Sequence, residues 1–506
     1  MSIFDKLKKD KPKSIYERIV EVIKETGSVP YDFEAEHKEY KDNELRFAPG
    51  AMDGILSHHA NAGEDDFVDK FKQCLKSTPE KAMKKIDGMN DLRTSAVYSG
   101  LIDHIFEHKD EFDPKKIAET AVYFAMNSTK TETVKLGLVL FALFDFSDNL
   151  STRDIMLKLG CCEEFTRFAS IAADNSLSSD IYQEMVFEWA KMLHGWGKIE
   201  AVENLEPSTE EIKHWILCNG CENAVLPAYL GLVCAEKCGL YERLKKGGLS
   251  DEEFNGACVI MEGLLDEGPC IGLSGLEEPV EFTLLFLDEM AKRPIDKDML
   301  FMLTLISDYF ENKWEGGGAE ETAKKINELT EKTDIEKVLK DGIKDNIYVC
   351  LQSAKKYDID LSKELIELMS ADFGKYCSSC WYLFGREKYI DEFFELCDKN
   401  IDESIYPRGM GEALFPKLSD GAYRLDGIVQ YFGKYPLKGK KIIDIALNSP
   451  VVSWRNMAVR ALTEWTKQLG KPLKEIDADL YNTAERIRKE EVSKSVKENF
   501  EKLFKE

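Results

Sequence analysis

The spacing of the apolar residues limits this chain to a helical fold. Apolar side chains recur every three or four positions, as they do on one face of an α-helix. Two such series are Ile181, Met185, Val186, Trp189, Met192 and Leu193, and Trp454, Ala458, Ala461, Leu462, Trp465 and Leu469. Alternating Val, Ile and Thr stretches are scarce, and no Asn-Gly or Asp-Gly pair joins two of them as in a β-hairpin. The sequence therefore predicts an all-α protein.

Several helix starts are marked by the pattern Ser-x-x-Glu. A Ser or Thr side chain accepts a hydrogen bond from the exposed N–H groups of a first helical turn, and the Glu three residues later reaches back to the cap. The pattern occurs at Ser77-Thr-Pro-Glu80, Ser208-Thr-Glu-Glu211 and Ser250-Asp-Glu-Glu253. We expect helices to begin at these places.

The helices recur at a nearly constant interval. Apolar helical segments begin near Leu92, Thr133, Ile181 and Val225, at intervals of roughly 40 to 50 residues, the period of HEAT and armadillo units. Residues 448–462, with Pro450 before a Val-Arg and an Ala-Leu pair, resemble the second helix of a HEAT repeat. This predicts an irregular HEAT/armadillo-like α-solenoid of helix pairs. The irregular helices of an ordinary α-domain stay open as the alternative.

Local composition suggests five segments. Residues 1–13 form a lysine-rich, basic flexible arm, and 14–63, with two prolines and many charges, an irregular N-terminal cap. A helical-repeat region is expected over 64–314 and a C-terminal helical-repeat region over 320–506. Between them, the three consecutive glycines of 315–319 disfavour a helix and predict a Gly-rich hinge.

The charge balance excludes several partners. With 93 acidic and 68 basic residues the chain carries a formal charge of −25, which disfavours nucleic acid and anionic lipid as partners. The longest apolar run, from Leu136 to Phe144, is far shorter than the ~20 residues of a membrane-spanning helix. The start of the chain lacks the apolar core of a secretion signal, and the 13 cysteines are scattered and odd in number. These features predict a cytoplasmic protein without a membrane span.

One group of cysteines has a spacing typical of a zinc site. Cys218 and Cys221 form a CxxC pair, and Cys234 and Cys238 follow one helical turn apart. Four thiolates complete a tetrahedral zinc shell, so these four residues are the candidate ligands of a structural zinc. The alternative is that Cys234 and Cys238, inside an apolar stretch, pack as small buried residues.

Three further patterns contain reactive side chains. His104-Ile-Phe-Glu-His108 matches the HxxEH of inverzincin peptidases, with Glu184 at the spacing of a third zinc ligand, although a helical repeat is an unusual setting for that motif. His58-His59 lies among carboxylates, where a metal or acid–base site competes with a solvated acidic loop. Cys377-Ser-Ser-Cys380 is a second CxxC without the strand–turn–helix context of a thioredoxin-like redox site.

No recognisable cofactor motif is found. A dinucleotide fingerprint requires correctly spaced glycines after a strand, and the segment 268–275 has neither the spacing nor the strand. Walker A, haem-thiolate and Gly-x-Ser-x-Gly patterns are absent from the sequence. The catalytic and cofactor-binding residues, if the protein is an enzyme, are not predicted.

Two segments resemble bacterial proteins grouped as limonene hydroxylases. They are the opening Met1-Ser-Ile-Phe-Asp-Lys-Leu-Lys-Lys-Asp-Lys-Pro-Lys-Ser-Ile-Tyr-Glu-Arg18 and Arg46-Phe-Ala-Pro-Gly-Ala-Met-Asp-Gly-Ile-Leu-Ser-His-His59. The resemblance implies an NAD(P)H-dependent monooxygenase that hydroxylates a monoterpene, a small apolar substrate, with oxidation of the product alcohol as a further activity. Such chemistry requires a cofactor that activates oxygen, because ordinary side chains do not perform it.

The residues themselves favour another class of protein. A non-catalytic helical-repeat scaffold that binds a protein or peptide partner accounts for the periodicity and the acidic surface together. With a charge of −25, a basic or apolar partner is the expected one.

Overall fold

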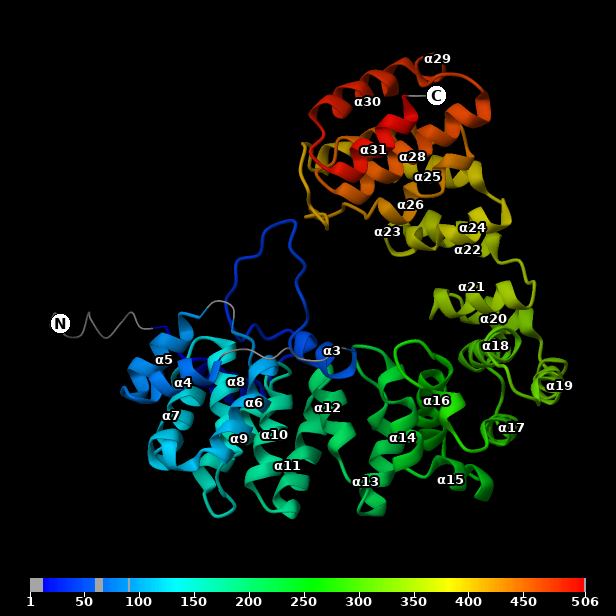
Figure 1. Cartoon of the computed structure of the whole chain (residues 1–506). Helices are drawn as coiled ribbons and strands as arrows, with labels where there is room; N and C mark the ends of the chain where they lie inside the picture. The colour runs from blue at the N-terminus through cyan, green and yellow to red at the C-terminus, as the bar shows by residue number, and fades with distance from the viewer. Residues whose placement is uncertain (1–11, 60–66, 90–91, 505–506) are drawn as a thin grey trace. The chain divides into compact units, whose positions relative to one another are not determined.

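The computed structural model describes residues 12–59, 67–89 and 92–504, with the side chains of 57–59 left out (Figure 1). Every regular element in these residues is a helix, and strand-like pairing is limited to two isolated bridges, Glu267 with Cys270 and Ala413 with Val451. The all-α prediction is confirmed.

The contacts divide the chain into two compact units. The first contains Met1–Lys38, Phe47–Arg293 and Leu305–Lys325, and the second contains Glu39–Arg46, Pro294–Thr304 and Ile326–Glu506. The helices α18 (Lys297–Asn312) and α19 (Ala319–Thr330) have residues in both.

The α-helices of the first unit are α2 (Ile15–Thr26), α3 (Ala51–His59), α4 (Phe67–Leu75), α5 (Pro79–Asp87), α6 (Thr94–Glu107), α7 (Pro114–Asn127), α8 (Thr131–Phe141), α9 (Leu150–Gly160), α10 (Thr166–Ser176), α11 (Ser179–Met192), α12 (Trp196–Asn204), α13 (Glu210–Trp215), α14 (Gly231–Lys237), α15 (Leu240–Lys246), α16 (Asp251–Leu265) and α17 (Pro279–Met290). Those of the second are α20 (Ile335–Gly342), α21 (Ile347–Lys356), α22 (Ser362–Ala371), α23 (Phe373–Tyr376), α24 (Cys380–Arg386), α25 (Ile390–Asn400), α26 (Asp426–Val429), α27 (Lys440–Leu447), α28 (Val452–Leu469), α29 (Leu473–Ile476), α30 (Ala478–Glu490) and α31 (Lys494–Leu503).

Most of the longest apolar run of the sequence, residues 136–141, lies in a core helix. Nearly every residue of α8 is buried, and this helix packs against α7 and α10. A helix that is buried on nearly all sides lies in the centre of a helical domain, where neighbours cover each face. In the described residues no helix has both the length and the hydropathy that a bilayer crossing requires.

A buried charged cluster attaches α3 to this core. The Lys135 ammonium of α8, 3% exposed, lies 2.5 Å from Asp53 Oδ2 of α3 and 2.6 Å from Glu164 Oε1. Glu132 Oε1 lies 3.5 Å away, and Glu164 also accepts a hydrogen bond from the backbone N–H of Gly50. Burial lowers the pKa of Lys135, but the three carboxylates outweigh it and raise the pKa, so the lysine stays charged and joins the two helices.

The second unit has α28 near its centre, packed against α26, α27 and α31. Trp454, Ala458, Ala461, Leu462 and Trp465 are buried, as the helical spacing predicts, whereas Leu469 at the end of the helix is 42% exposed. Arg455 lies on the same buried side of α28, where its guanidinium needs a partner. The partner is Glu491, in the turn between α30 and α31, and both side chains are fully buried.

The predicted helix starts are accurate to within two residues. Ser250 and Glu253 form the reciprocal hydrogen bonds of the expected box at the start of α16. At α13 the cap is Thr209 in place of Ser208, and it accepts from the N–H of Ile212. At α5 the helix begins at Pro79, and the Ser77 hydroxyl instead donates to Cys74 O. Neighbouring Ser and Thr residues compete for the cap position, and the sequence pattern alone does not show which of them caps the helix.

The three glycines of 315–319 form a turn between α18 and α19. The Trp314 indole N–H donates to Gly317 O at 2.9 Å, and a Cβ on Gly316 would lie 2.4 Å from the indole ring. Gly318 has a φ of +88°, and a Cβ there would lie 2.6 Å from Val280. The segment lies within the first unit. Its action as a hinge stays a prediction, and the predicted basic arm lies outside the described residues apart from Pro12 and Lys13.

Candidate metal centre

His214, Cys218 and Glu252 bring three ligand-type side chains together in the first unit. His214 lies in the last turn of α13, and Cys218 lies in the π-helical turn η2 (Ile216–Gly220) that directly continues α13. Glu252 is the second residue of α16. Single π-helical turns are rare and are often found at functional sites, because they change the direction of side chains along a helix.

A glycine allows α16 to approach this turn closely. A Cβ on Gly256 would lie 2.1 Å from Leu217 O and 2.8 Å from Cys218 Cα, distances that no side chain can occupy. Gly256 is one helical turn after Glu252, so the contact between α16 and η2 places the Glu252 carboxylate beside Cys218.

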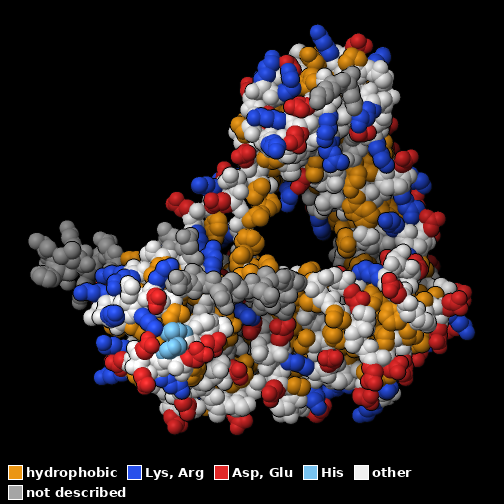
Figure 2. All heavy atoms as spheres, viewed as in Figure 1, with side chains coloured by type: hydrophobic (Ala, Val, Ile, Leu, Met, Phe, Trp, Pro, Cys, Tyr) orange, Lys and Arg blue, Asp and Glu red, His pale blue; other side chains and the backbone are white. Residues whose placement is uncertain are grey.

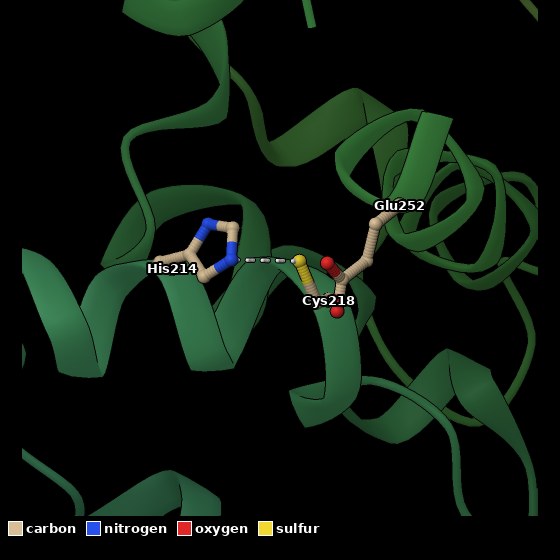
Figure 3. Close-up of side chains that lie close together, drawn as sticks. All are labelled: His214, Cys218 and Glu252. Atoms are coloured by element: carbon tan, nitrogen blue, oxygen red, sulfur yellow. Dashed lines mark hydrogen bonds between the residues drawn. The ribbon is translucent and has the colours of Figure 1, made fainter. Parts of the chain in front are cut away.

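The ligand atoms of the three residues all lie within 4.8 Å of one another (Figure 3). His214 Nε2 and Cys218 Sγ are 3.7 Å apart. In a tetrahedral zinc site, with Zn–N of about 2.0 Å and Zn–S of about 2.3 Å, these two atoms are separated by about 3.6 Å. The histidine and the cysteine therefore already have the separation of two ligands of one ion.

The Glu253 carboxylate lies beside Nδ1, the second ring nitrogen of His214. Its Oε1 lies 3.5 Å from His214 Nδ1 and 3.5 Å from Arg243 Nη1, while its Oε2 accepts a 2.9 Å hydrogen bond from Ser250 N. The pKa of Glu253 is lowered, chiefly by that backbone hydrogen bond. The Ser250 side chain, His214 and Arg243 act in the same direction, and together they outweigh the effect of burial. A carboxylate beside Nδ1 suits a proton on that nitrogen, and a metal would then bind at Nε2.

The thiol of Cys218 is not activated as a nucleophile. Burial, and after it Glu252 and Glu253, raise its pKa, although Arg243 acts in the opposite direction. Catalytic cysteines have lowered pKa values and lie beside positive charge. Although Cys218, His214 and Glu253 follow one another in the order of a nucleophile, a base and an acid, the raised pKa of the thiol does not support covalent catalysis.

The four cysteines predicted from spacing are close in the fold without forming one cluster. Cys234 is fully buried and shares a hydrogen bond with Cys221, while Cys238 donates to Ala235 O at 3.8 Å. Burial raises the pKa of Cys238 to about 12, with smaller opposing effects from Arg243. In the described part of the chain, no three of the four sulfur atoms lie within 4.8 Å of one another. The four-cysteine zinc site stays a prediction, and Cys218 is the member that the structure pairs with other ligands.

The spacing of His214 and Cys218 was the missed signal. Residues four apart lie on one helix face, so this pair offered two ligands from a single element. The third ligand follows a capping box that was predicted, but which side chain α16 presents to η2 depends on tertiary packing.

Within the described residues, the HxxEH motif and the second CxxC do not assemble into sites with three ligands. The His104 and His108 rings are stacked, with centroids 4.2 Å apart, and Glu184 lies on α11, which is not among the main neighbours of α6. Cys377 and Cys380 are buried and donate to Gly374 O and Gly427 O. The side chains of His58-His59 lie outside the described residues.

An apolar surface in the second unit is the other candidate site. Segment 39–46 runs beside the long loop between η6 (Glu403–Ile405) and α26, where Leu414 N donates to Asp42 O at 3.0 Å and Lys417 pairs with Asp42 at 2.6 Å. The exposed apolar side chains of the two segments are Tyr40, Leu45, Leu414, Phe415 and Leu418. We refer to these five residues as the loop surface.

The long loop that carries Leu414, Phe415 and Leu418 is anchored by polar contacts at other residues. Arg455 Nη2 donates to Gly411 O at 2.7 Å, Nη1 donates to Ser449 O at 2.7 Å, and the guanidinium pairs with Glu491. The hydroxyl of Tyr406 bridges to the backbone of Tyr423 at the other end of the loop. These contacts fix the loop although it contains no regular structure.

Two surface depressions offer volume for a small molecule. One, of about 430 Å³, is lined by α28, α31 and the turn around Gly433, and its charged residues are Arg460, Glu464, Lys467 and Lys502. The other, of about 540 Å³, is lined by residues between Asp145 and Ser151. Both linings contain charged side chains, which suit a polar ligand better than an apolar one.

The fold and these residues define an all-helical protein with a candidate metal centre and a surface of exposed apolar side chains. Comparison with known proteins adds no family: no family model, no curated protein and no solved structure matches the chain.

Proposed function

We propose that this protein is a helical scaffold that binds a polypeptide segment rich in apolar and basic side chains. The observation that carries the proposal is the loop surface, where Phe415 is 56% exposed and Leu45 is 57% exposed. Exposed apolar side chains on neighbouring segments are typical of protein-binding surfaces.

The charge of the chain supports a basic partner. Acidic side chains are spread over the face in view in Figure 2, with Lys and Arg between them, and the formal charge is −25. Such a field attracts positive segments and accelerates their encounter, while the apolar contacts supply affinity. The irregular α-solenoid of helix pairs is part of this proposal, because stacked helix pairs present extended binding surfaces.

Peptide selection followed by mutation tests the scaffold. Peptides selected by phage display on the wild-type protein are measured by calorimetry against the wild type and Phe415→Asp/Leu418→Asp. We expect the double variant to lose about 10-fold or more in affinity, because central apolar side chains dominate such interfaces. Leu150→Asp, at a 73% exposed position of the first unit, is the matched control and is expected to bind normally. Peptides that bind the double variant equally well would refute the loop surface as the binding site.

The resemblance to limonene hydroxylases supports an alternative proposal, an NAD(P)H-dependent monooxygenase acting on a monoterpene. Purified protein is tested for bound chromophore and metal, and for NAD(P)H consumption that depends on limonene. Turnover with formation of an oxygenated product would establish the oxygenase and reject a purely non-catalytic scaffold. A colourless protein that consumes no reductant would reject the oxygenase.

A further inference from the structure

We propose that His214, Cys218 and Glu252 bind one divalent cation of the zinc class, with Glu253 as a positioning residue for His214. The proposal is independent of the scaffold function. It rests on four residues that three elements, α13, η2 and α16, bring to one place.

The donor set selects the class of metal. A thiolate and an imidazole are ligands of zinc and other late first-row ions, whereas magnesium and calcium are bound by oxygen atoms alone. The 3.7 Å separation of His214 Nε2 and Cys218 Sγ fits tetrahedral geometry. Glu252 completes the set with a rotation of its exposed side chain, since its ligand oxygen is already within 4.8 Å of the other two.

The histidine is oriented before any metal binds. Glu253 Oε1 faces His214 Nδ1, and Glu253 is itself fixed by Ser250 N and by Arg243. A carboxylate behind a ligating histidine is a recurrent feature of zinc proteins, because it fixes the ring and increases its basicity. Hydrogen bonds of the capping box thus serve both the helix and the site.

The site leaves the ion accessible. The His214 side chain is 48% exposed and Cys218 is partly exposed, so a fourth ligand is a water molecule or a donor atom of a bound molecule. Zinc sites with three protein ligands and an open position are typical of exchangeable or reactive ions, in contrast to closed structural sites. Binding replaces the Cys218 S–H proton, which is released to solvent, by the S–metal bond.

Metal titration of the full-length protein tests the proposal. Zinc is titrated into metal-free, reduced protein by calorimetry, and cobalt(II) is added separately while its absorption is recorded. We expect one equivalent of each ion, with a thiolate-to-cobalt charge-transfer band and the intense visible bands of tetrahedral cobalt. His214→Ala, Cys218→Ser and Glu252→Gln are each expected to lose about 10-fold or more in affinity, since even residues outside the metal shell contribute about 10–100-fold.

Matched controls separate this site from other zinc ligands. His37→Ala and Cys270→Ser replace a histidine and a cysteine outside the cluster and are expected to bind as the wild type does. The three ligands are at least partly exposed, so the far-ultraviolet circular dichroism of their variants is expected to remain native. Zinc is expected to raise the thermal midpoint of the wild type and of both controls only.

Three outcomes would overturn the proposal. One is the lack of a thiolate-to-cobalt band in the wild type. Another is unchanged zinc affinity in both His214→Ala and Cys218→Ser. The third is zinc binding that survives His214→Ala but is lost in Cys234→Ser and Cys238→Ser, which would assign the metal to the four cysteines instead.

Discussion

Glu203 is a carboxyl group whose protonation is coupled to folding. It lies on α12, and burial, with the nearby Glu200 second, raises its pKa to about 7, although Lys237 and Arg167 act in the opposite direction. Between the ordinary value of 4.5 and about 7, the folded protein holds a proton that the unfolded chain has released. The resulting stability is present below pH 4.5 and is lost as the pH rises through 7.

We expect Glu203→Gln to remove this pH dependence. A neutral amide avoids the burial of charge, so the variant is predicted to be more stable than the wild type by about 1–3 kcal/mol near pH 8 and equally stable near pH 4.5. Urea unfolding at a series of pH values measures the difference. Glu206→Gln, an exposed position just beyond α12, is the control. Parallel stability curves for wild type and Glu203→Gln would show that the fold does not raise the pKa of this carboxyl group.

Single residues also show where sequence-based prediction stops. The periodicity of Trp454 and Trp465 predicts a helix with one buried side, and the structure confirms it. The same spacing does not predict that Arg455 is buried on that side. Its guanidinium can be buried there because the Glu491 carboxylate pairs with it. Such a pair depends on two segments 36 residues apart in the chain, and only the tertiary structure brings them together.

At the scale of elements, the Arg455–Glu491 pair joins α28, the turn before α31 and the loop that contains Gly411. Glu491 also accepts hydrogen bonds from the backbone N–H groups of Val492 and Ser493. A buried carboxylate that loses its partner destabilises a protein strongly, whereas joint replacement of both partners by apolar residues is much less harmful.

Arg455→Met is therefore expected to destabilise the second unit by about 3–5 kcal/mol, and the double variant Arg455→Met/Glu491→Leu by less. Urea unfolding gives the energies, and amide hydrogen exchange around Leu414 reports the release of the loop. The exposed Arg460 of the same helix provides the control Arg460→Met, with a change of under about 0.5 kcal/mol. If the double variant were as unstable as Arg455→Met, the pair would not be the cause.

The candidate metal centre illustrates the same limit for elements. The capping box at Ser250 and the start of α16 were predictable, because they depend on residues three positions apart. The π-helical turn and the contact of α16 with η2 were not predictable. The wider π-helical turn changes the direction of the side chains, and Gly256 allows the close approach of α16, so tertiary packing decides which side chains meet. As a result, Cys218 was predicted as a ligand and its partners His214 and Glu252 were not.

At the scale of the whole molecule, the charge of −25 affects stability at every position. Like charges repel over long distances in the compact state, whereas most ion pairs here are exposed, and exposed pairs contribute about 0–1 kcal/mol each. Salt weakens both effects, and with this imbalance we expect the long-range repulsion to be the larger one.

We expect salt to stabilise the protein. Between about 20 and 200 mM NaCl the Debye length falls from about 20 to about 7 Å, so distant repulsion is screened. The thermal midpoint is predicted to rise by about 2–4 °C, the shift that about 1 kcal/mol produces in a domain of 150–250 residues. Differential scanning calorimetry measures it, and choline chloride is expected to act as NaCl does. A falling midpoint would show that the ion pairs dominate.

The glycine turn of 315–319 determines how freely this stretch of sequence can vary. Gly317 has open space where a Cβ would be placed, whereas Gly316 faces the Trp314 indole and Gly318 faces Val280 with a positive φ. Three identical neighbours therefore differ in their tolerance to substitution: the middle position accepts a side chain, and the outer two do not. Random mutation of this segment would accumulate changes at one glycine and eliminate them at the other two.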